Sequence, residues 1–451
     1  MPISEVDKLL GIEAYATKTE GVGGAIKQSV EDFIVEEILV DGSKASIDGV
    51  VSNRVIGSSA QRQRYLLCLL VKRNWDTFIA TKNVAKSLGV DQGMVQLAGI
   101  KDAKAITAQY ITIENASIED VAKIDVKDVK VTPIGYVREM MSLFYLLGNN
   151  FIITIKKTEA PESVVHERIG QAIKEISDIG GTPNFFGHQR FGTTRPITHL
   201  IGKALTQGRF EEAAMLYLGN PSAYEHPASR IARQQVQETH DFKRASENFP
   251  KQLRFERLML NHLAEKPTDF VGAFQCLPPK LQALFVQAHQ SYLFNLFLSG
   301  RMKRGLPLNE VVIGDFAVGV ERSGLPLTII DKVVTVENLD QINSAVKAGK
   351  MRVALPIFGM RQKLSAGVMG QIEREVLAAE GIGDGPIRLN ELSRVGGKGG
   401  LRTVTAPVRD FKVLESSDDS VKVCFKLLRG CYATVLLREM IKPADPVFAG
   451  F

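Results

Sequence analysis

An aspartate flanked by lysines is the residue of this sequence best suited to covalent chemistry. The segment at residues 99–109, Gly-Ile-Lys-Asp-Ala-Lys-Ala-Ile-Thr-Ala-Gln, sets Asp102 behind a glycine and between Lys101 and Lys104. A loop just beyond a strand is where a rigid sheet presents a reactive group. Positive charge on both sides would keep the carboxylate ionised, as a nucleophile requires. An isolated Lys-Asp pair is more often a capping or turn feature, so the segment alone does not decide.

A second segment, at residues 184–192, combines aromatic rings with planar hydrogen-bonding groups. Its sequence is Asn-Phe-Phe-Gly-His-Gln-Arg-Phe-Gly. A splayed nucleobase gains roughly 1–3 kcal/mol by stacking on an aromatic ring, and amide or guanidinium groups can reach its edge or its phosphate. The segment therefore suits a nucleobase, with Gln189 and Arg190 as candidate donors. The alternative is a packed loop whose rings fill the core and in which His188 has a structural role.

Tyr432 and Lys27 are weaker candidates when each is considered alone. Residues 427–439 combine a strand end with a helix start, and Tyr432 stands at that start. A ring packed at a helix N-terminus is the more common role of such a residue. Lys27 comes four residues before Glu31, and an isolated lysine of this kind is usually a solvated surface residue.

Basic residues also cluster along the chain, and each cluster is a candidate phosphate track. The clusters are Arg230, Arg233, Lys243, Arg244, Lys251, Arg254 and Arg257; residues 301–304; and Arg394, Lys398 and Arg402. Acidic residues interrupt the first cluster, so a solvated helix face is the preferred interpretation there.

The elements that must position these residues are mostly strands. Residues 76–89 predict a helix that Asp76 caps and Gly89 ends, with Phe78, Ile79, Ala85 and Leu88 on its apolar face. Because strands and helices do not alternate regularly, we expect an α+β fold with an antiparallel or mixed sheet. Strands are predicted at residues 31–40, 64–72, 94–98, 109–114, 151–156 and 421–428, and further helices at residues 162–179 and 432–441.

The pattern changes to predominantly helical between about residues 198 and 300. Stretches without internal glycine predict helices at residues 234–248, 251–262 and 277–298, and strand signals return at 311–313 and 332–336. A chain of 451 residues is long enough for two cores, so this change marks a candidate second domain.

Composition limits the class of protein. With 45% hydrophobic and 24% charged residues the chain is typical of a globular protein, and its conspicuous apolar run at residues 66–71 is too short to span a bilayer. The N-terminus does not resemble a secretory signal, so the cytoplasm is the expected compartment. A net charge of +6 permits a nucleic-acid partner without requiring one.

Cysteines and sequence motifs exclude several chemistries. The four cysteines include no C-x-x-C pair, so we expect neither a zinc site nor disulfides but reduced, mostly buried thiols. The dinucleotide-binding, P-loop, zincin and hydrolase-elbow motifs are absent from the sequence.

Taken together, these segments resemble the TruD family of tRNA pseudouridine synthases. The likeness lies in the kind and order of the motifs over most of the chain, and residues 99–109 and 184–192 are the most specific. The length suggests an archaeal source. The other matching motifs are Glu-Asp-Phe-Ile-Val-Glu at 31–36, Ala-His-Gln-Ser-Tyr-Leu-Phe-Asn at 288–295, and Gly-Cys-Tyr-Ala-Thr at 430–434 with Arg438-Glu439.

The resemblance implies a domain organisation and a set of site residues. A pseudouridine-synthase core with a central mixed or antiparallel sheet, residues 1–195 and 403–451, is interrupted by a helix-rich α+β insertion domain, residues 196–402. Asp102 is implied as the catalytic nucleophile and Lys27 as the basic residue beside it. The uracil pocket is implied to include Asn184 and Phe186, with Tyr432 where bacterial relatives are expected to have Phe.

The implied reaction is isomerisation of uridine to pseudouridine, usually at position 13 of tRNA. The N1–C1′ bond breaks, the uracil turns, and C5 joins C1′; whether the carboxylate adds to C1′ or C6 or acts through a glycal stays open. The implied partner is tRNA, with no cofactor, metal, membrane or protein partner. Two alternatives are a catalytically silent RNA-binding protein and an enzyme acting on a free nucleoside. Retention of Asp102 disfavours the first, and the basic chain with its helical insertion disfavours the second.

Overall fold

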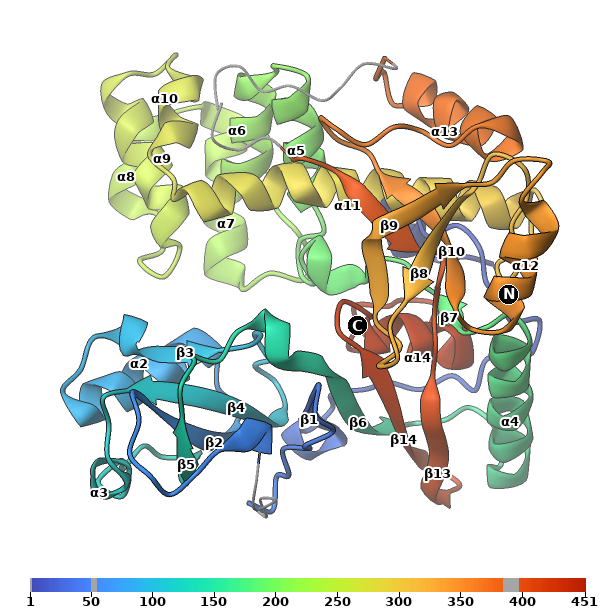
Figure 1. The fold of residues 1–451 in the computed structure, drawn as a ribbon. Coiled ribbons are helices and arrows are strands. Elements are labelled where there is room, and N and C mark those ends of the chain that lie inside the picture. Colours follow the sequence, from blue (N-terminus) through green and yellow to red (C-terminus); the bar gives the residue numbers. More distant parts are fainter. Residues whose placement is uncertain (1, 50–54, 384–396) are drawn as a thin grey trace.

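A mixed sheet forms the base of the molecule. The computed structural model describes residues 2–49, 55–383 and 397–451, with the backbone alone at 329–330. The eight-stranded sheet has the order β13-β14-β6-β1-β4-β2-β5, with β3 also pairing with β4 (Figure 1). The β1–β4 pair is parallel and the other pairs of neighbours in this sheet are antiparallel. The expected α+β class with a central mixed sheet is confirmed.

The strands of this sheet come from both ends of the chain. β6 pairs with β1 on one side and with β14 on the other. A hairpin from the last fifty residues therefore lies directly against strands of the first third. The strands are Phe33–Leu39 (β1), Tyr65–Arg73 (β2), Val95–Leu97 (β3), Ile106–Glu114 (β4), Val129–Val137 (β5), Leu146–Lys156 (β6), Arg409–Ser417 (β13) and Ser420–Leu428 (β14).

One face of the β14 end of the sheet is covered by two helices, Glu162–Asp178 (α4) and Ala433–Ile441 (α14). Alternate residues of β14 are buried, including Val423 and Phe425, as expected for a strand with one face in the core. These side chains share a cluster with Ile169 of α4 and Leu437 of α14. Burial of this apolar face fixes the start of α14, where Tyr432 stands.

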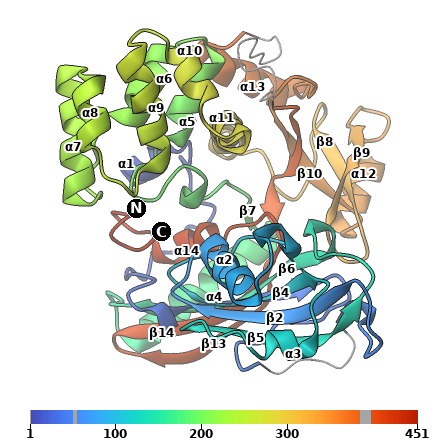
Figure 2. The same ribbon diagram turned by 90° about the vertical axis from the view of Figure 1, so that its left-hand side faces the viewer.

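The rest of the chain lies above the sheet (Figures 1 and 2). A four-stranded antiparallel sheet, β11-β10-β8-β9, stands on one side and a group of helices on the other, and the long helix α11 runs from the helices to the sheet. The helices are Thr198–Thr206 (α5), Phe210–Leu218 (α6), Pro227–Thr239 (α7), Phe242–Asn248 (α8), Arg254–Glu265 (α9), Phe270–Gln275 (α10), Pro279–Lys303 (α11), Leu339–Lys347 (α12) and Gly367–Ala379 (α13). The strands are Phe316–Val320 (β8), Pro326–Val333 (β9), Met351–Ile357 (β10) and Gly400–Thr403 (β11).

Three predicted elements differ from the structure. The strand expected at 332–336 overlaps only the end of β9, which stops at Val333. The single helix expected at residues 234–248 is two helices, α7 and α8, because His240 adopts the left-handed conformation with φ +53°. The strand expected at 311–313 is wrong, since β8 begins only at Phe316. His240 caps α7 through its backbone N–H, which donates to the carbonyl of Val236.

The helix Thr77–Leu88 (α2) has the predicted caps but not the predicted face. Asp76 accepts hydrogen bonds at its N-terminus, and Gly89 ends it with φ +68°. Phe78 and Ile79, however, are each 53% exposed. The buried residues are Thr77, Ala80, Thr81, Val84 and Ala85. The predicted apolar face is therefore wrong for Phe78 and Ile79, whereas Ala85 is buried and Leu88 packs against the same core as predicted.

Two other expectations about side-chain environment are wrong. Among the four free cysteines only Cys68 is buried, and Cys276 is exposed. Arg233, assigned to a solvated helix face, is buried and pairs with Glu225 and Glu256 at 2.8 and 2.7 Å. Residue 394 of the third basic cluster lies outside the described residues.

A buried ionic network fastens the chain's first helix, Glu5–Leu9 (α1), to the rest. Asp7 lies 2.9 Å from His188 Nε2 and accepts a 2.8 Å hydrogen bond from Arg438 Nε. Burial opposes the charge of Asp7, but Arg438 and His188 outweigh it and hold the pKa of this carboxyl below its usual value. The network joins α1, the 184–192 segment and α14.

Replacing Asp7 by Asn should lower the free energy of unfolding by about 3–5 kcal/mol, because it removes one partner of a buried ion pair. Denaturant unfolding measures this change. Glu5→Gln in the same helix removes an exposed pair with Lys8 and should cost no more than about 0.5 kcal/mol. The advantage of wild type over Asp7→Asn should shrink below about pH 4, as the pH falls through the lowered pKa of Asp7. Equal losses in both variants would contradict the role of the network.

Candidate active site

Asp102 lies in the loop between β3 and β4, paired with Lys27. The ammonium Nζ of Lys27 donates to Asp102 Oδ1 at 3.0 Å. The Asp102 side chain is 32% exposed, whereas that of Lys27 is 11% exposed. The carboxylate is therefore held by a nearly buried cation, and part of it remains accessible to a substrate.

The backbone of Lys27 is strained. Its φ is +55°, the left-handed region that lysine rarely adopts. The neighbouring residues fix it there, because Ala25 N donates to Lys156 O and Ile26 N donates to Ala449 O, both at 2.8 Å. The ammonium also lies 4.4 Å from the centre of the Phe33 ring, a cation–π contact. Such strain, of order 1–3 kcal/mol, is typical of functional sites.

The main chain on both sides of Asp102 is held by buried side chains. Lys72 Nζ donates to the carbonyls of Asp102 at 2.7 Å and Trp75 at 2.8 Å. Thr77 Oγ1 donates to the Lys101 carbonyl at 3.0 Å and accepts from the Lys101 amide at 3.1 Å. Burial lowers the pKa of Lys72 to about 8. β2 and α2 thus orient the carboxylate through the peptide groups beside it.

The two lysines that flank Asp102 do not act as the sequence suggested. Lys101 Nζ lies 2.8 Å from Glu37 Oε1 and donates to Asn149 Oδ1 at 2.8 Å. Lys104 is exposed and makes no ion pair within residues 2–49, 55–383 and 397–451. The expectation that these two supply the charge beside the carboxylate is wrong, because Lys27 supplies it. Lys101 instead ties the loop to β1 and β6.

Two aromatic rings and an arginine surround the Phe186 ring. Phe186 meets Tyr432 and Phe294 edge to face, at ring-centre distances of 6.2 and 5.5 Å. The guanidinium of Arg402 lies 4.1 Å from the centre of the Phe186 ring. Arg402 also donates to Asn184 O at 2.8 Å and to Asn184 Oδ1 at 2.6 Å. The asparagine side chain is therefore held in one orientation beside the Phe186 ring.

The other two predicted site residues of this segment, Gln189 and Arg190, form hydrogen bonds with residues of helices. Gln189 is exposed, and its Oε1 accepts from Thr434 Oγ1 at 3.1 Å. Arg190 donates to Ser291 Oγ at 3.1 Å and to Gln287 Oε1 at 3.2 Å, both on α11. These contacts anchor the segment to α14 and α11.

The two halves of the site meet through β6 and β14. A Cβ added at Gly99 would lie 3.5 Å from Leu146 Cδ2, so the Asp102 loop touches the start of β6. Asn149, which binds Lys101, pairs in register with Leu427 of β14. Over the described parts of the chain, no hydrogen bond or ion pair joins the Lys27–Asp102 pair directly to Phe186.

Several residues of the site carried no assigned role in the sequence. Arg402 had been considered only as part of a phosphate track. Asn295 of α11 accepts from the Phe186 amide at 2.8 Å and donates to the Phe186 carbonyl at 3.0 Å. It also donates to Leu10 O at 2.9 Å. An asparagine among the apolar residues of a long helix was the signal that could have revealed this contact.

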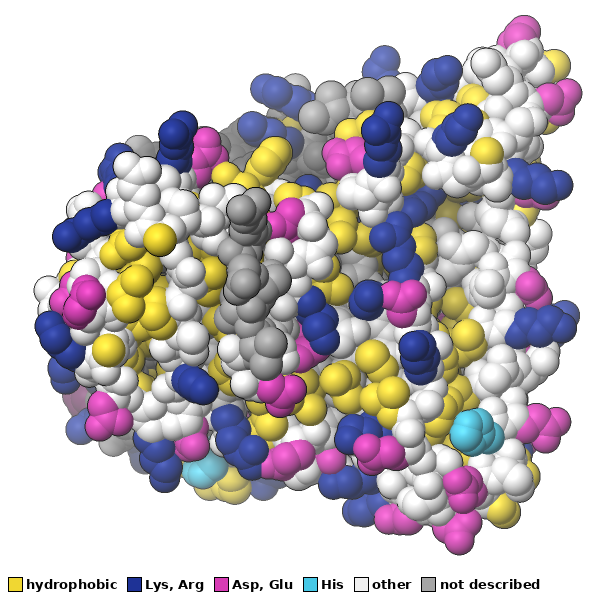
Figure 3. Space-filling model, turned by 60° about the horizontal axis from the view of Figure 1, so that its bottom comes forward, with side chains coloured by type: hydrophobic (Ala, Val, Ile, Leu, Met, Phe, Trp, Pro, Cys, Tyr) yellow, Lys and Arg dark blue, Asp and Glu magenta, His cyan; other side chains and the backbone are white. Residues whose placement is uncertain are grey.

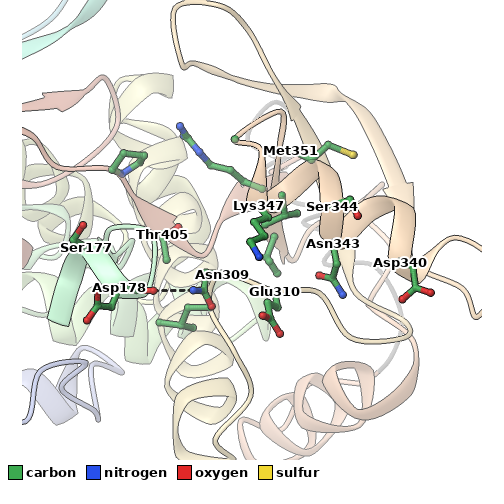
Figure 4. Close-up of a pocket in the computed structure, with 17 residues that line it drawn as sticks. Ser177, Asp178, Asn309, Glu310, Asp340, Asn343, Ser344, Lys347, Met351 and Thr405 are labelled. Carbon is green, nitrogen blue, oxygen red and sulfur yellow. Dashed lines mark hydrogen bonds between the residues drawn. The ribbon is translucent and has the colours of Figure 1, made fainter. Parts of the chain in front are cut away.

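A cavity of about 740 Å³ lies between the end of α4, α12 and β10, and Arg352 and Thr405 are in its lining (Figure 4). Asn309 Nδ2 donates to Asp178 O at 2.8 Å in its wall. Its carboxylates, Asp178, Glu310 and Asp340, would repel a polyanion, and the lining includes none of the predicted site residues.

Metal ligands and membrane helices were sought in the same ranges. No group of three His, Cys, Asp or Glu side chains in the described chain is arranged to hold a metal ion. None of the described helices is long and apolar enough to cross a membrane.

A lysine-paired carboxylate at one edge of the mixed sheet, and a cluster of aromatic rings with a fixed asparagine amide, are residue types suited to chemistry on a nucleobase. The family model for tRNA pseudouridine synthase D (TruD) matches residues 9–440. The chain is 38% identical over 452 residues to the protein named tRNA pseudouridine synthase D in Methanosarcina barkeri, covering 99% of each. It is 37% identical over 429 residues to the one so named in Pyrococcus abyssi, covering 95% of this chain and 98% of that one.

A solved structure agrees with these similarities. The crystal structure described as tRNA pseudouridine synthase D from Methanosarcina mazei has a TM-score of 0.82 and 35% identity, with all of both chains covered. The chain belongs to the TruD family of tRNA pseudouridine synthases.

Thr77→Val should loosen the Asp102 loop, because it leaves the amide and carbonyl of Lys101 without their buried partner. We expect a loss of about 1–3 kcal/mol in the free energy of unfolding and faster hydrogen exchange at the Lys101 amide. Thr81→Val, whose hydroxyl bonds only to Phe78 O of its own helix, is the matched control and should leave that amide protected. Equal protection of the Lys101 amide in wild type and Thr77→Val would refute the anchoring role of Thr77.

Proposed function

We propose that this chain isomerises uridine to pseudouridine in tRNA, at position 13, with Asp102 as the nucleophile. The observation that carries the proposal is the Lys27–Asp102 pair at 3.0 Å, which is open to solvent. It is joined through β6 and β14 to the side chains around Phe186, where we place the uracil pocket, called here the Phe186 pocket. Membership of the family supplies the reaction class. The relatives' names support tRNA as substrate, and the family's usual target supports position 13.

The reaction moves a bond without a change of oxidation state. The N1–C1′ bond breaks, C5 forms a bond to C1′, the C5 proton leaves and N1 gains a proton. In this proposal the Asp102 carboxylate acts on the substrate and is regenerated unchanged, and the hydrogen bond from the ammonium of Lys27 holds it in position. This geometry is equally compatible with addition of the carboxylate to C1′, its addition to C6, and a glycal route.

The detached uracil must stay in the pocket while it turns. The rings of Phe186 and Tyr432 give the uracil flat surfaces on which to stack. Rotation of the uracil against such a surface costs little free energy. Asn184 Oδ1 is fixed by Arg402 and keeps a second lone pair for a uracil N–H. The target nucleotide must leave the stack to enter, so we infer that the enzyme binds it flipped out.

Gln189 and Arg190 are proposed to contact the RNA at the rim of this pocket. Gln189 is exposed and its Oε1 is anchored by Thr434, so its amide N–H groups face outward without reorganisation. Arg190 is held by α11 through two of its nitrogens, which leaves further N–H groups for a phosphate.

We also propose the domain division that the family likeness implies. Residues 1–195 and 403–451, which contain the eight-stranded sheet, would form the catalytic domain, and residues 196–402 the insertion domain. One apolar cluster includes Phe185 and Val435 of the first part and Phe294 and Val353 of the second. The insertion is therefore expected to fold against the core. Since the proposed substrate is cytoplasmic tRNA, we place the enzyme in the cytoplasm.

Asp102→Asn should abolish turnover while leaving tRNA affinity within a few-fold, because the amide keeps the shape of the carboxylate but not its nucleophilicity. Release of tritium from tRNA labelled at C5 of uridine measures turnover, since C5 loses its hydrogen when it bonds to C1′. Asp125→Asn, an exposed aspartate, is the control and should keep the wild-type rate. Appreciable tritium release by Asp102→Asn would place the nucleophile elsewhere.

Phe186→Ala should slow single turnover by about 5- to 150-fold, because loss of a stacking surface costs roughly 1–3 kcal/mol, with little change in tRNA binding. Tyr432→Ala should behave similarly. Tyr432→Phe keeps the ring, and the hydroxyl makes no hydrogen bond to another described residue, so its rate should match wild type. Unchanged single-turnover kinetics in Phe186→Ala would assign Phe186 to core packing alone.

A further inference from the structure

Three arginines line a small cavity beside the Phe186 pocket. Its volume is about 150 Å³, and Asn184, Arg352, Arg402, Arg429 and Gly430 are in its wall. The other polar residues of the lining are threonines and Cys431, and no carboxylate among the described residues lines it. On the face shown in Figure 3, by contrast, Lys and Arg side chains are interspersed with Asp and Glu.

Arg352, on β10, is the arginine with the most unused hydrogen-bonding capacity. Its side chain is partly buried, yet the guanidinium makes no hydrogen bond or ion pair with any residue in the described ranges. Burial lowers the pKa of this guanidinium, and the nearby charge of Arg409 lowers it further. An arginine remains charged in proteins, so its five N–H donors are available to an anion.

Arg402 and Arg429 are each fixed at one end and free at the other. Arg402 binds Asn184 through Nε and Nη2, and its Nη1 lies 3.9 Å from the position of a Cβ added at Gly430. Arg429 Nη1 donates to the carbonyls of Leu143 and Leu146 at 2.6 and 3.0 Å. Its Nε and Nη2 have no hydrogen-bond partner in the described chain. The planes of both guanidiniums are therefore set before any ligand arrives.

The cavity concentrates positive charge that nothing in its wall neutralises. Cys431 lies near both Arg352 and Arg402, but burial raises the pKa of its thiol, so it is no counter-ion at neutral pH. Like charges held together at low dielectric repel unless an anion joins them. Guanidinium forks match the oxygens of a phosphate, which is the anion that arginine clusters bind best.

We propose that this cavity binds a phosphate group of the RNA substrate. The inference rests on the proposed function and deepens it. Asn184 lines the cavity and stands at the uracil pocket, and Cys431 directly precedes Tyr432. An RNA strand whose uracil enters the Phe186 pocket therefore brings a neighbouring backbone phosphate to the arginines. Such a contact fixes the position of the strand without reading its sequence.

The test is the salt dependence of tRNA binding by wild type and Arg352→Met. Loss of one phosphate contact should reduce the slope of log K against log salt by about 0.7–0.9 in magnitude. Arg62→Met, at an exposed arginine, should keep the wild-type slope. Arg352→Lys keeps the charge and should recover most of the slope. Thermal unfolding identifies any variant that fails to fold, and an unchanged slope in folded Arg352→Met would overturn the proposal.

Inorganic phosphate distinguishes the source of the anion. If phosphate raises the melting temperature of wild type but not of Arg352→Met, while both bind tRNA with the same slope, the cavity holds a free anion and the RNA assignment is wrong. Binding is measured without turnover, so it is independent of the chemistry. A reduced slope together with no tritium release from wild type would sink the proposed reaction and leave the phosphate site supported. A wild type that binds no tRNA would overturn both.

Discussion

The site depends on the pairing of β6 with strands from both ends of the chain. β6 binds β1 along one edge and β14 along the other, and the same strand supplies Asn149 to the Asp102 loop. This pairing brings the loop after β3 and the turn before α14 to neighbouring positions, although more than three hundred residues separate Asp102 from Tyr432. The C-terminal part of the chain must therefore return to the sheet and pair β14 with β6 before the site is complete.

Three lysines near Asp102 have different partners, and this difference explains how the Asp102 carboxylate can be both fixed in position and accessible. Lys27 binds the carboxylate, Lys72 binds the carbonyl of the same residue, and Lys101 is neutralised by Glu37. Only Lys27 contacts the carboxylate itself. Lys72 holds the Asp102 carbonyl and Lys101 ties the loop to β1 and β6, so the carboxylate keeps one face open while its backbone has little freedom to move.

The local features of the fold could be predicted from the sequence, but the contacts between distant segments could not. The caps of α2, the bounds of β14 and the position of Tyr432 at a helix start follow from short-range rules, and the structure confirms them. The exposed face of α2 and the roles of Lys101 and Arg402 depend on partners far along the chain. Lys27 entered only through the family likeness, because nothing within a few residues of a lone lysine reveals a carboxylate seventy-five positions away.

The most direct test of the central claim is pseudouridine mapping on an unmodified tRNA transcript that carries uridine 13. Carbodiimide labelling followed by primer extension should give a new stop at that position with wild-type protein and none with Asp102→Asn. Such a result would establish the reaction, the target and the nucleophile together. The absence of a stop in every tRNA that the wild-type protein binds would contradict the account and identify the chain as an RNA-binding member of the family without the chemistry.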